Sequence, residues 1–261
     1  MNRNNYDLFC YKVHQLTGLN LALYKDRQMK RRLNAFMYTL EVNNYLELGR
    51  KLEQDKAALD KFCKFVTINV TEFFRGSEQF KTLQEKILPQ LIRPGVTFKA
   101  WSAGCSDGSE PYSLVMILEE MGLTNYQIHA TDLNSDMLAK AKVGVYAKSA
   151  LEKVPDALVA KYFVKASDKA YQFDSTKARN VKFYQQDLLK DPYKKCFDLI
   201  ICRNVVIYFT EEAKDLVFMK MAKSLRKGGI LFVGGTESIL AAEALGLKTE
   251  LPFFYRKDTI N

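Results

Sequence analysis

Histidine, paired cysteines and long apolar runs are what this 261-residue sequence has least of. It contains two histidines, His14 and His129, and five scattered cysteines that form no C-x-x-C pair. This pattern predicts reduced thiols, and it argues against a zinc site, an imidazole metal cluster and a histidine-based catalytic triad. We therefore expect no metal ion. Because His129 lies in a predicted strand between two apolar residues, we expect it to be a packed or rim side chain.

No run of about 18 apolar residues is present, and the first residues lack the apolar centre of a signal peptide. We therefore expect a soluble, cytoplasmic protein with no direct membrane insertion. Hydrophobic residues make up 48% of the chain, which is enough for the core of one large domain or two modest ones.

Basic residues outnumber acidic ones by 39 to 30, giving a formal net charge of +9. Such an excess favours an acidic partner, which leaves nucleic acid, anionic lipid and an acidic protein helix open. Residues 25–32 carry five cations, and at helical spacing Arg27, Lys30 and Arg31 share one exposed face. That face is either a solvated helix surface or a docking surface for an acidic partner.

Periodicity divides the chain into a helical part and an α/β part. Apolar residues recur every three or four positions through residues 6–75, which predicts a small helical domain, and residues 79–92 predict a linking helix. From residue 96 onward strands and helices alternate, which indicates a mostly parallel sheet. The expected strands are 96–102, 126–131, 180–184, 196–202, 229–234 and 252–257. The expected helices are 111–121, 134–142, 211–226 and 237–245.

The alternation lapses between residues 144 and 179, where short alternating runs predict a small antiparallel insert. The final residues, 247–257, contain two short β-like runs around Pro252, which predict a hairpin at the sheet edge.

A glycine turn joins the first predicted strand to the next helix. Gly104 and Gly108 allow the backbone to pass close to a ligand, and the following helix directs free N–H groups at the same place. The spacing is not G-x-G-x-x-G, which disfavours a dinucleotide pyrophosphate site. Asp132 ends the second strand, where a carboxylate can accept both ribose hydroxyls. Together these features predict an adenosine-bearing cofactor in a Rossmann-like domain, although each alone fits an ordinary turn or a helix N-cap.

Two further strand ends carry polar residues. Asp187 and Leu188 suit an adenine pocket, where a polar group meets the exocyclic amine and an apolar one covers the ring. Arg203 and Asn204 end the next strand, with Tyr208 just beyond. Polar residues gathered at strand ends on one side of a sheet are typical of a ligand site.

Polar residues also interrupt the apolar segment 67–75, at Asn69, Thr71 and Arg75. Buried polar groups require partners, and a ligand, helix caps or inter-domain hydrogen bonds would each serve.

In this order the motifs resemble the CheR-type chemotaxis receptor methyltransferases, which esterify receptor glutamates with S-adenosylmethionine and release S-adenosylhomocysteine. The matching motifs are Asn69-Val-Thr-Glu-Phe-Phe-Arg75, Trp101-Ser-Ala-Gly-Cys-Ser106, Glu110-Pro-Tyr-Ser113, Ala130-Thr-Asp132, the run from Phe197 to Phe209, and Gly228-Gly229. The resemblance implies an α/β fold class: a small N-terminal all-helical domain and a Rossmann-like S-adenosylmethionine-dependent methyltransferase domain with a small antiparallel β insert. The corresponding ranges are 1–75 for receptor docking, 76–95 for a linker helix, and 96–261 with the insert at about 145–180.

The resemblance also implies roles for individual residues. Glu110 would hold the charged end of the cofactor, Asp132 the ribose, and Asp187 with Leu188 the adenine. The implied cofactor contacts are Asn69, Thr71, Arg75, Gly104, Glu110, Asp132, Asp187, Leu188, Asn204 and Val205. Arg75 and Tyr208 are the candidates for aiming the substrate glutamate, and the implied receptor-docking cations are Arg27, Lys30, Arg31 and Arg32.

The chain departs from the usual family pattern at Asp107 and Ser109, where Thr and Glu are common. Because Gly104, Gly108 and Glu110 are intact, we expect cofactor binding to survive. The expected partners are the acidic methylation helices of chemotaxis receptors and not nucleic acid, the expected state is a monomer, and the expected location is cytoplasmic, at membrane receptor arrays.

Two alternatives remain. A nucleic-acid methyltransferase fits the basic charge, but Val205-Val206 does not supply the Pro-Pro turn usual for nitrogen methylation of a base. A catalytically silent protein that senses S-adenosylmethionine is the second.

Overall fold

The computed structural model describes residues 3–66 and 71–258. It divides the chain into two compact units: Met1–Ile68 with Ile207–Leu216, and Asn69–Val206 with Val217–Asn261. The sequence placed the end of the helical part at residue 75, whereas this division falls at residue 68. The inclusion of Ile207–Leu216 in the first unit has no counterpart in the sequence prediction.

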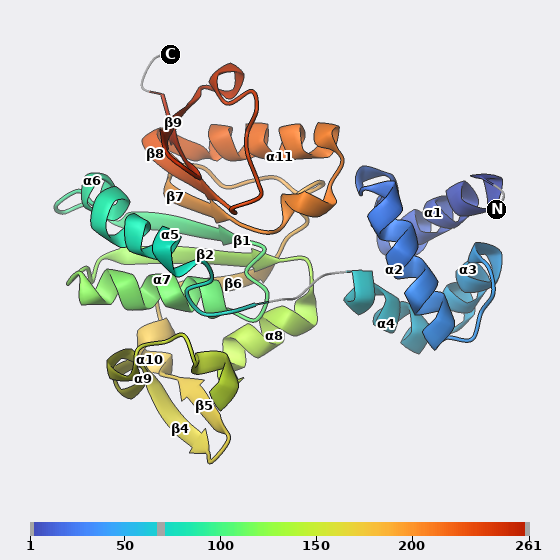
Figure 1. The fold of residues 1–261 in the computed structure, drawn as a ribbon, viewed down its shortest axis with the longest axis horizontal. Coiled ribbons are helices and arrows are strands. Elements are labelled where there is room, and N and C mark those ends of the chain that lie inside the picture. Colours follow the sequence, from blue (N-terminus) through green and yellow to red (C-terminus); the bar gives the residue numbers. More distant parts are fainter. Residues whose placement is uncertain (1–2, 67–70, 259–261) are drawn as a thin grey trace. The chain divides into compact units, whose positions relative to one another are not determined.

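The first unit is helical (Figure 1). Its elements are α1 (Arg3–Thr17), the 3-10 turn η1 (Leu21–Leu23), α2 (Asp26–Thr39), α3 (Tyr45–Gln54) and α4 (Lys56–Val66). Phe62 is fully buried, and the rings of Phe9 and Phe36 meet it edge-on with centroids 6.0 and 5.6 Å away. An isolated β-bridge between Tyr24 and Phe209 joins the later segment to this unit.

The second unit is built on a seven-stranded sheet of strand order β6-β2-β1-β7-β8-β10-β9. The strands are β1 (Phe98–Ala103), β2 (Tyr126–Asp132), β6 (Val181–Gln185), β7 (Phe197–Cys202), β8 (Leu225–Val233), β9 (Leu247–Leu251) and β10 (Phe254–Lys257). The first five in the order are parallel, and β10 runs antiparallel to both neighbours. Because helices cover both faces of a parallel sheet, its central strands are mostly apolar, and every residue of β7 is buried. The predicted Rossmann-like fold and the terminal hairpin are confirmed.

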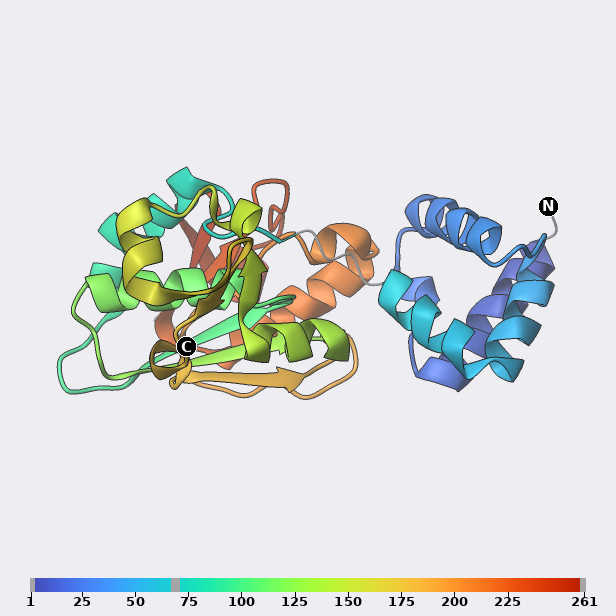
Figure 2. The same ribbon diagram turned by 90° about the horizontal axis from the view of Figure 1, so that it is seen from below.

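Helices lie on both faces of this sheet (Figures 1 and 2). α7 (Ser109–Glu120) and α8 (Ser135–Val143) cover one face, and residues 217–224 of α11 (Glu211–Ser224) lie on the other. The expected linking helix at 79–92 consists of α5 (Ser77–Thr82), the π turn η2 (Leu83–Ile87) and α6 (Leu88–Leu91). Its residues Phe80 and Leu83 belong to the same buried cluster as the sheet residue Phe98, so this helix is core rather than linker.

A second, three-stranded antiparallel sheet of order β3-β5-β4 forms the insert. Its elements are β3 (Val145–Ala147), η3 (Lys148–Leu151), α9 (Asp156–Tyr162), β4 (Phe163–Ser167), β5 (Ala170–Phe173) and α10 (Ser175–Ala178). Phe173 stacks on Tyr112 of α7 with ring centroids 4.1 Å apart, which fixes the insert to that face of the main sheet (Figure 1). The predicted antiparallel insert is confirmed.

The helix predicted at 237–245 is wrong, because only the 3-10 turn η5 (Glu243–Leu245) forms there. The backbone N–H of Glu237 donates to the carbonyl of Gly234, and the Glu237 side chain turns back to the same residue, so the segment begins as a tight turn. β8 also begins at Leu225, earlier than the predicted residue 229.

Candidate cofactor site

Four parallel strands bring their carboxyl ends to one edge of the main sheet. β1 ends before Gly104, β2 ends at Asp132, β6 ends shortly before Asp187, and β7 ends shortly before Asn204. In open α/β sheets the crevice at this edge is where ligands bind. The predicted residues at the strand ends therefore lie along one edge of the second unit.

The glycine turn passes very close to the end of β7. Gly104 has φ of +82°, and a Cβ atom at this position would stand 2.4 Å from Cγ2 of Val205. The backbone N–H groups of Gly104 and Cys105 both donate to the carbonyl of Thr131, at 2.8 and 2.9 Å, which fixes the turn against β2. A glycine is needed at 104 because a larger residue would displace Val205.

Glu110, in the first turn of α7, lies in a charged and partly enclosed setting. Its Oε1 accepts a 2.7 Å hydrogen bond from the Ser102 hydroxyl, and its Oε2 lies 3.9 Å from Nη1 of Arg203. Burial raises the pKa of Glu110, while the charge of Arg203, the Ser102 hydrogen bond and the charge of Arg75 oppose that rise. A carboxylate at a helix N-terminus is favoured by the helix dipole and can bind a cationic group.

Arg203 is a site residue that the sequence prediction left without a role. Its guanidinium lies 5.3 Å from the ring centroid of Phe80 and 4.7 Å from that of Phe232, and it donates to Oε1 of Gln79. Burial lowers its pKa, Glu110 opposes this, and its buried Nε has no hydrogen-bond partner among the described residues. Arg203 thus pairs with Glu110 from a buried position. Its place next to Asn204 in the family motif was the feature of the sequence that could have identified it as a site residue.

Asp132 shapes the glycine turn as well as facing the site edge. Its Oδ2 accepts from the N–H of Ser106 and its Oδ1 from the N–H of Asn134, both at 2.8 Å. Burial raises its pKa, and backbone hydrogen bonds from Asn134, Ser106 and Leu133 oppose the rise. A carboxylate has about four lone-pair positions, so these three backbone bonds leave acceptor capacity for a ribose hydroxyl.

Asp187 and Leu188 form the turn that follows β6. Oδ1 of Asp187 accepts from the N–H of Leu189 at 2.9 Å, and the Leu188 side chain is buried. The Leu188 carbonyl accepts from Tyr193 Oη at 2.6 Å and from Lys220 Nζ at 3.1 Å. Tyr193 and Lys220 therefore hold the backbone of this turn. Its polar side chain, Asp187, and its apolar side chain, Leu188, are adjacent, as an adenine pocket requires.

Asn204 and Val205 follow β7 and are held by Glu237. Asn204 has φ of +59°, a conformation that is rare for a residue with a side chain. The carboxylate of Glu237 accepts from the backbone N–H groups of Asn204, Val205 and Gly234. Glu237 was missed at the sequence level because a glutamate after a Gly-Gly pair has no distinctive local pattern.

The segment before α5 reaches the glycine turn through Thr71. Its hydroxyl donates a 2.6 Å hydrogen bond to Oδ2 of Asp107, whose Oδ1 accepts from the N–H and the hydroxyl of Ser109. The two departures from the family pattern are thus bonded to each other. Arg75 lies in the same unit and acts electrostatically on Glu110 and Arg203. Asn69 lies outside the described residues.

Tyr208 belongs to the first unit, whereas Arg75 belongs to the second. The Tyr208 backbone carbonyl accepts from the N–H of Lys25 at 2.9 Å. The joint action of Tyr208 and Arg75 on a substrate stays a prediction.

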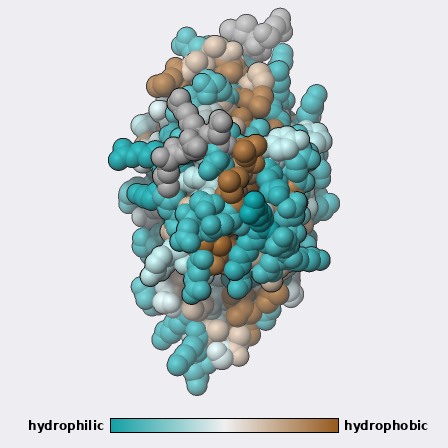
Figure 3. All heavy atoms as spheres, turned by 90° about the vertical axis from the view of Figure 1, so that its right-hand side faces the viewer, coloured by the Kyte–Doolittle hydropathy of each residue, from teal (hydrophilic) through white to brown (hydrophobic). Residues whose placement is uncertain are grey.

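The four cations predicted for receptor docking differ in their surroundings on α2. Arg27 and Arg31 are exposed, and Lys30 pairs with Asp26 at 2.6 Å. Arg32 donates to the carbonyl oxygens of Phe65 and Val66, at the end of α4, so it departs from the prediction of a free docking cation. On the face of the molecule that Figure 3 shows, most residues are hydrophilic, and the hydrophobic residues form small clusters among them.

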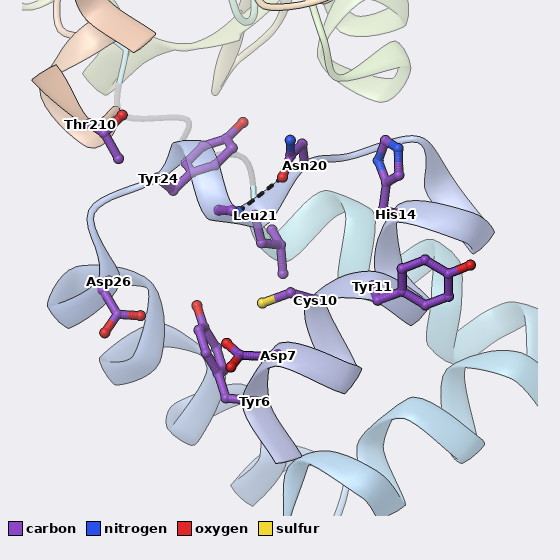
Figure 4. Close-up of a pocket in the computed structure, with 11 residues that line it drawn as sticks. Tyr6, Asp7, Cys10, Tyr11, His14, Asn20, Leu21, Tyr24, Asp26 and Thr210 are labelled. Carbon is purple, nitrogen blue, oxygen red and sulfur yellow. Dashed lines mark hydrogen bonds between the residues drawn. The ribbon is translucent and has the colours of Figure 1, made fainter. Parts of the chain in front are cut away.

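A pocket of about 530 Å³ lies in the first unit, between α1, η1 and the start of α2 (Figure 4). Its wall includes the carboxylates of Asp7 and Asp26, the ring of Tyr6, and Asn20, whose side chain accepts from the N–H of Ala22. Of the predicted cofactor contacts that the structure describes, none lines this pocket.

The histidines and cysteines take no part in the site. His129 is buried and hydrogen-bonded to Tyr184 and Gln127, and burial lowers its pKa to about 4. The prediction of a packed side chain is confirmed. No disulfide joins any of the five cysteines, all of which lie in the described part of the chain. No described helix combines the length and the apolar character needed to cross a membrane.

Comparison with known proteins gives two matches that together span most of the chain. Residues 4–67 match the family described as CheR methyltransferase, all-alpha domain, and residues 69–250 match CheR methyltransferase, SAM binding domain. A chemotaxis protein methyltransferase of Listeria monocytogenes is 41% identical over 255 residues, 97% of each chain. One of Borreliella burgdorferi is 31% identical over 94% of this chain and 91% of its own, and chemotaxis protein methyltransferase 1 of Pseudomonas aeruginosa is 32% identical over 90% of each.

The groups at the sheet edge fit S-adenosylmethionine, the cofactor of the matched domain. Glu110 suits its ammonium group, the guanidinium of Arg75 suits its carboxylate, and Asp132 suits its ribose diol. The close contact of Gly104 with Val205 brings the backbone of the glycine turn to the same edge. The site, the fold and both domain matches agree that the chain belongs to the CheR methyltransferase family and uses S-adenosylmethionine.

Proposed function

We propose that this protein transfers a methyl group from S-adenosylmethionine to glutamate side chains of chemotaxis receptors and forms glutamyl methyl esters. The observation that carries the proposal is the charge pattern at the sheet edge, where the half-buried Glu110 and the buried Asp132 stand with the cations Arg75 and Arg203. Carboxylates suit a cationic donor and guanidinium groups suit a carboxylate acceptor. The chemotaxis methyltransferase names of the relatives support the same assignment.

The absence of histidine from the site agrees with a carboxylate acceptor. A glutamate is ionised at neutral pH and needs no general base, whereas most hydroxyl or amine acceptors do. His129 belongs to β2, where burial lowers its pKa to about 4 and its ring is hydrogen-bonded to Tyr184, so it is uncharged at neutral pH. His14 belongs to the first unit.

In this mechanism, the residues of the site bind and orient the reacting groups and exclude water from them. When bound, S-adenosylmethionine supplies an electrophilic methyl group on a positively charged sulfur. Glu110 would hold the ammonium group, Asp132 the ribose, and Asp187 with Leu188 the adenine. Partial burial of the site strengthens the attraction between opposite charges, and fixed orientation of the reacting groups can contribute roughly 7–11 kcal/mol.

Arg75 and Tyr208 would aim the incoming glutamate. An arginine that paired too tightly with the carboxylate would reduce its nucleophilicity, so we assign Arg75 a positioning role. We further propose that Arg27, Lys30 and Arg31 dock on acidic receptor helices, that the protein acts as a monomer in the cytoplasm at membrane receptor arrays, and that residues 1–75 provide the docking domain. Arg32 is left out because its Nη2 already donates to carbonyl oxygens at the end of α4.

The test incubates the purified chain and methyl-labelled S-adenosylmethionine separately with a receptor cytoplasmic fragment and with nucleic acid. We expect label on the receptor fragment that is released as methanol by mild base, which is the behaviour of a carboxylate ester. The control fragment has its candidate glutamates replaced by alanine and should remain unlabelled. Base-stable label on nucleic acid would indicate the alternative enzyme class. Binding of the cofactor without label on either substrate would indicate a sensor.

A further inference from the structure

Glu237 links two loops of the site that are far apart in sequence. It lies in the segment that follows β8 and is 4% exposed. Its Oε2 accepts from the N–H of Asn204 at 2.6 Å and from that of Gly234 at 2.8 Å, and its Oε1 accepts from the N–H of Val205 at 3.0 Å. One side chain therefore satisfies three backbone donors from the ends of β7 and β8.

The backbone that Glu237 holds has a conformation that few residues with a side chain adopt. Asn204 has φ of +59°, in the left-handed region that costs free energy for a residue with a side chain. Without the carboxylate, the N–H groups of Asn204 and Val205 would lose their acceptors in a partly buried position. The strained turn and its bonds to Glu237 are thus one structural unit.

This turn positions Val205 against the glycine turn. The Val205 Cγ2 occupies the space that a Cβ at Gly104 would need, 2.4 Å from the ideal Cβ position. The segments that follow β1 and β7 therefore meet closely at Gly104 and Val205. A shift of the turn at residues 204–205 would move this contact and with it the backbone at the sheet edge.

We propose that Glu237 is a positioning residue for the cofactor: its carboxylate holds Asn204 and Val205 in the one conformation that lets the crevice accept S-adenosylmethionine. Glu237 acts through backbone N–H groups and does not itself contact the cofactor. The proposal rests on the use of S-adenosylmethionine by this site, and it does not depend on which acceptor receives the methyl group.

The Glu237→Gln variant tests the proposal because it keeps the size of the side chain and removes its ability to accept at both ends. An amide oxygen can accept from two N–H groups, but the amide nitrogen would face a third donor. The matched control is Glu243→Gln, since Glu243 is an exposed glutamate of the same segment, in η5. Thermal unfolding curves of both variants are measured first, so that binding is compared at a temperature at which each variant is folded.

Calorimetric titration with S-adenosylhomocysteine at that temperature gives affinity and stoichiometry for the folded protein. We expect Glu237→Gln to bind about tenfold or more weakly at unchanged stoichiometry, because a buried N–H is left without an acceptor, and Glu243→Gln to bind as the wild type does. Hydrogen exchange should be faster at the amides of Asn204, Val205 and Gly234 in Glu237→Gln only. A merely structural role would lower the melting temperature and leave the affinity of the folded protein unchanged.

Equal affinity of folded Glu237→Gln and wild type would overturn the positioning role while leaving the cofactor site intact. Should Glu237→Gln fail to fold, the exchange rates of the same three amides in the wild type decide: slow exchange without ligand supports a preformed turn, and fast exchange that slows only with ligand contradicts it. Failure of the wild type itself to bind S-adenosylhomocysteine would instead count against the cofactor site as a whole.

Discussion

The Thr71 hydroxyl donates a 2.6 Å hydrogen bond to Oδ2 of Asp107, which lies 36 positions later in the chain. Oδ1 of Asp107 accepts from the N–H and the hydroxyl of Ser109. Because the Thr71 proton is directed at Asp107, the lone pairs of its oxygen remain available to accept from a ligand. The unusual Asp107 and Ser109 of this chain thus join the segment before α5 to the glycine turn.

Asp107→Ala and Thr71→Val should each weaken binding of S-adenosylhomocysteine by roughly tenfold, because each removes a hydrogen bond to a charged group. The double variant should bind no more weakly than the weaker-binding single variant, since the two residues act through one hydrogen bond. Isothermal titration measures all three affinities. Asp168→Ala is the control, because its side chain is 94% exposed at the tip of the insert. Fully additive losses would show that Thr71 and Asp107 act independently.

Arg75→Ala should lose most turnover, by about a hundredfold, while the protein stays folded, because a misplaced acceptor slows transfer strongly. Initial rates with labelled cofactor and receptor fragment measure the effect, and circular dichroism checks the fold. Arg179→Ala, a change at an exposed arginine of the same unit, should keep wild-type rates. Wild-type turnover in Arg75→Ala would remove Arg75 from the mechanism.

The affinity for S-adenosylmethionine should fall on acidification at pH values above 4.5, the ordinary pKa of a glutamate. Burial raises the pKa of Glu110, so this carboxylate loses its charge at a higher pH than an exposed glutamate would. Protonation removes the negative charge that binds the cofactor ammonium. For folding the sign is opposite: a raised carboxyl pKa favours the folded state at low pH, and that contribution is lost as the pH rises through the raised value.

Titrations of cofactor affinity against pH, with wild type and Glu110→Gln, measure this effect. Glu110→Gln should bind more weakly at neutral pH and should lose part of the pH dependence, and the remainder belongs to Asp132, whose pKa burial also raises. Identical pH profiles for the two proteins would contradict the assigned role of Glu110.

Charge reversal on α2 should weaken receptor methylation without changing the cofactor affinity. Arg27→Glu with Arg31→Glu removes the exposed cations, so KM for the receptor fragment should rise severalfold and its dependence on salt should diminish. Lys56→Glu with Lys61→Glu, at two exposed lysines of α4, changes the net charge equally and is the control. An unchanged KM in the α2 variant would place the docking surface elsewhere.

Local patterns in the sequence predicted the main features of the fold. Apolar runs that end in polar residues marked the parallel strands, and because such strands share one edge, Gly104, Asp132 and Asp187 could be grouped before the structure was known. The motif order supplied Glu110 in the same way. These predictions needed only short-range spacing and one topological rule.

Contacts between distant residues could not be predicted in that way. Glu237 bonds to Asn204 and Val205 across more than 30 positions, and the same bonds replace the helix expected at 237–245 with a turn. Arg32 has the composition and spacing of a surface cation, yet the carbonyl oxygens at the end of α4 bind it. In each case a partner that lies far away in sequence decides the conformation.

The most direct test of the account is calorimetric titration of S-adenosylhomocysteine into the wild-type protein and into Asp132→Ala. Asp132 both faces the site edge and accepts from Ser106 in the glycine turn, so the account predicts binding at one site per chain in the wild type and its loss in the variant. Binding of equal strength in both proteins would contradict a cofactor site at the carboxyl ends of these strands.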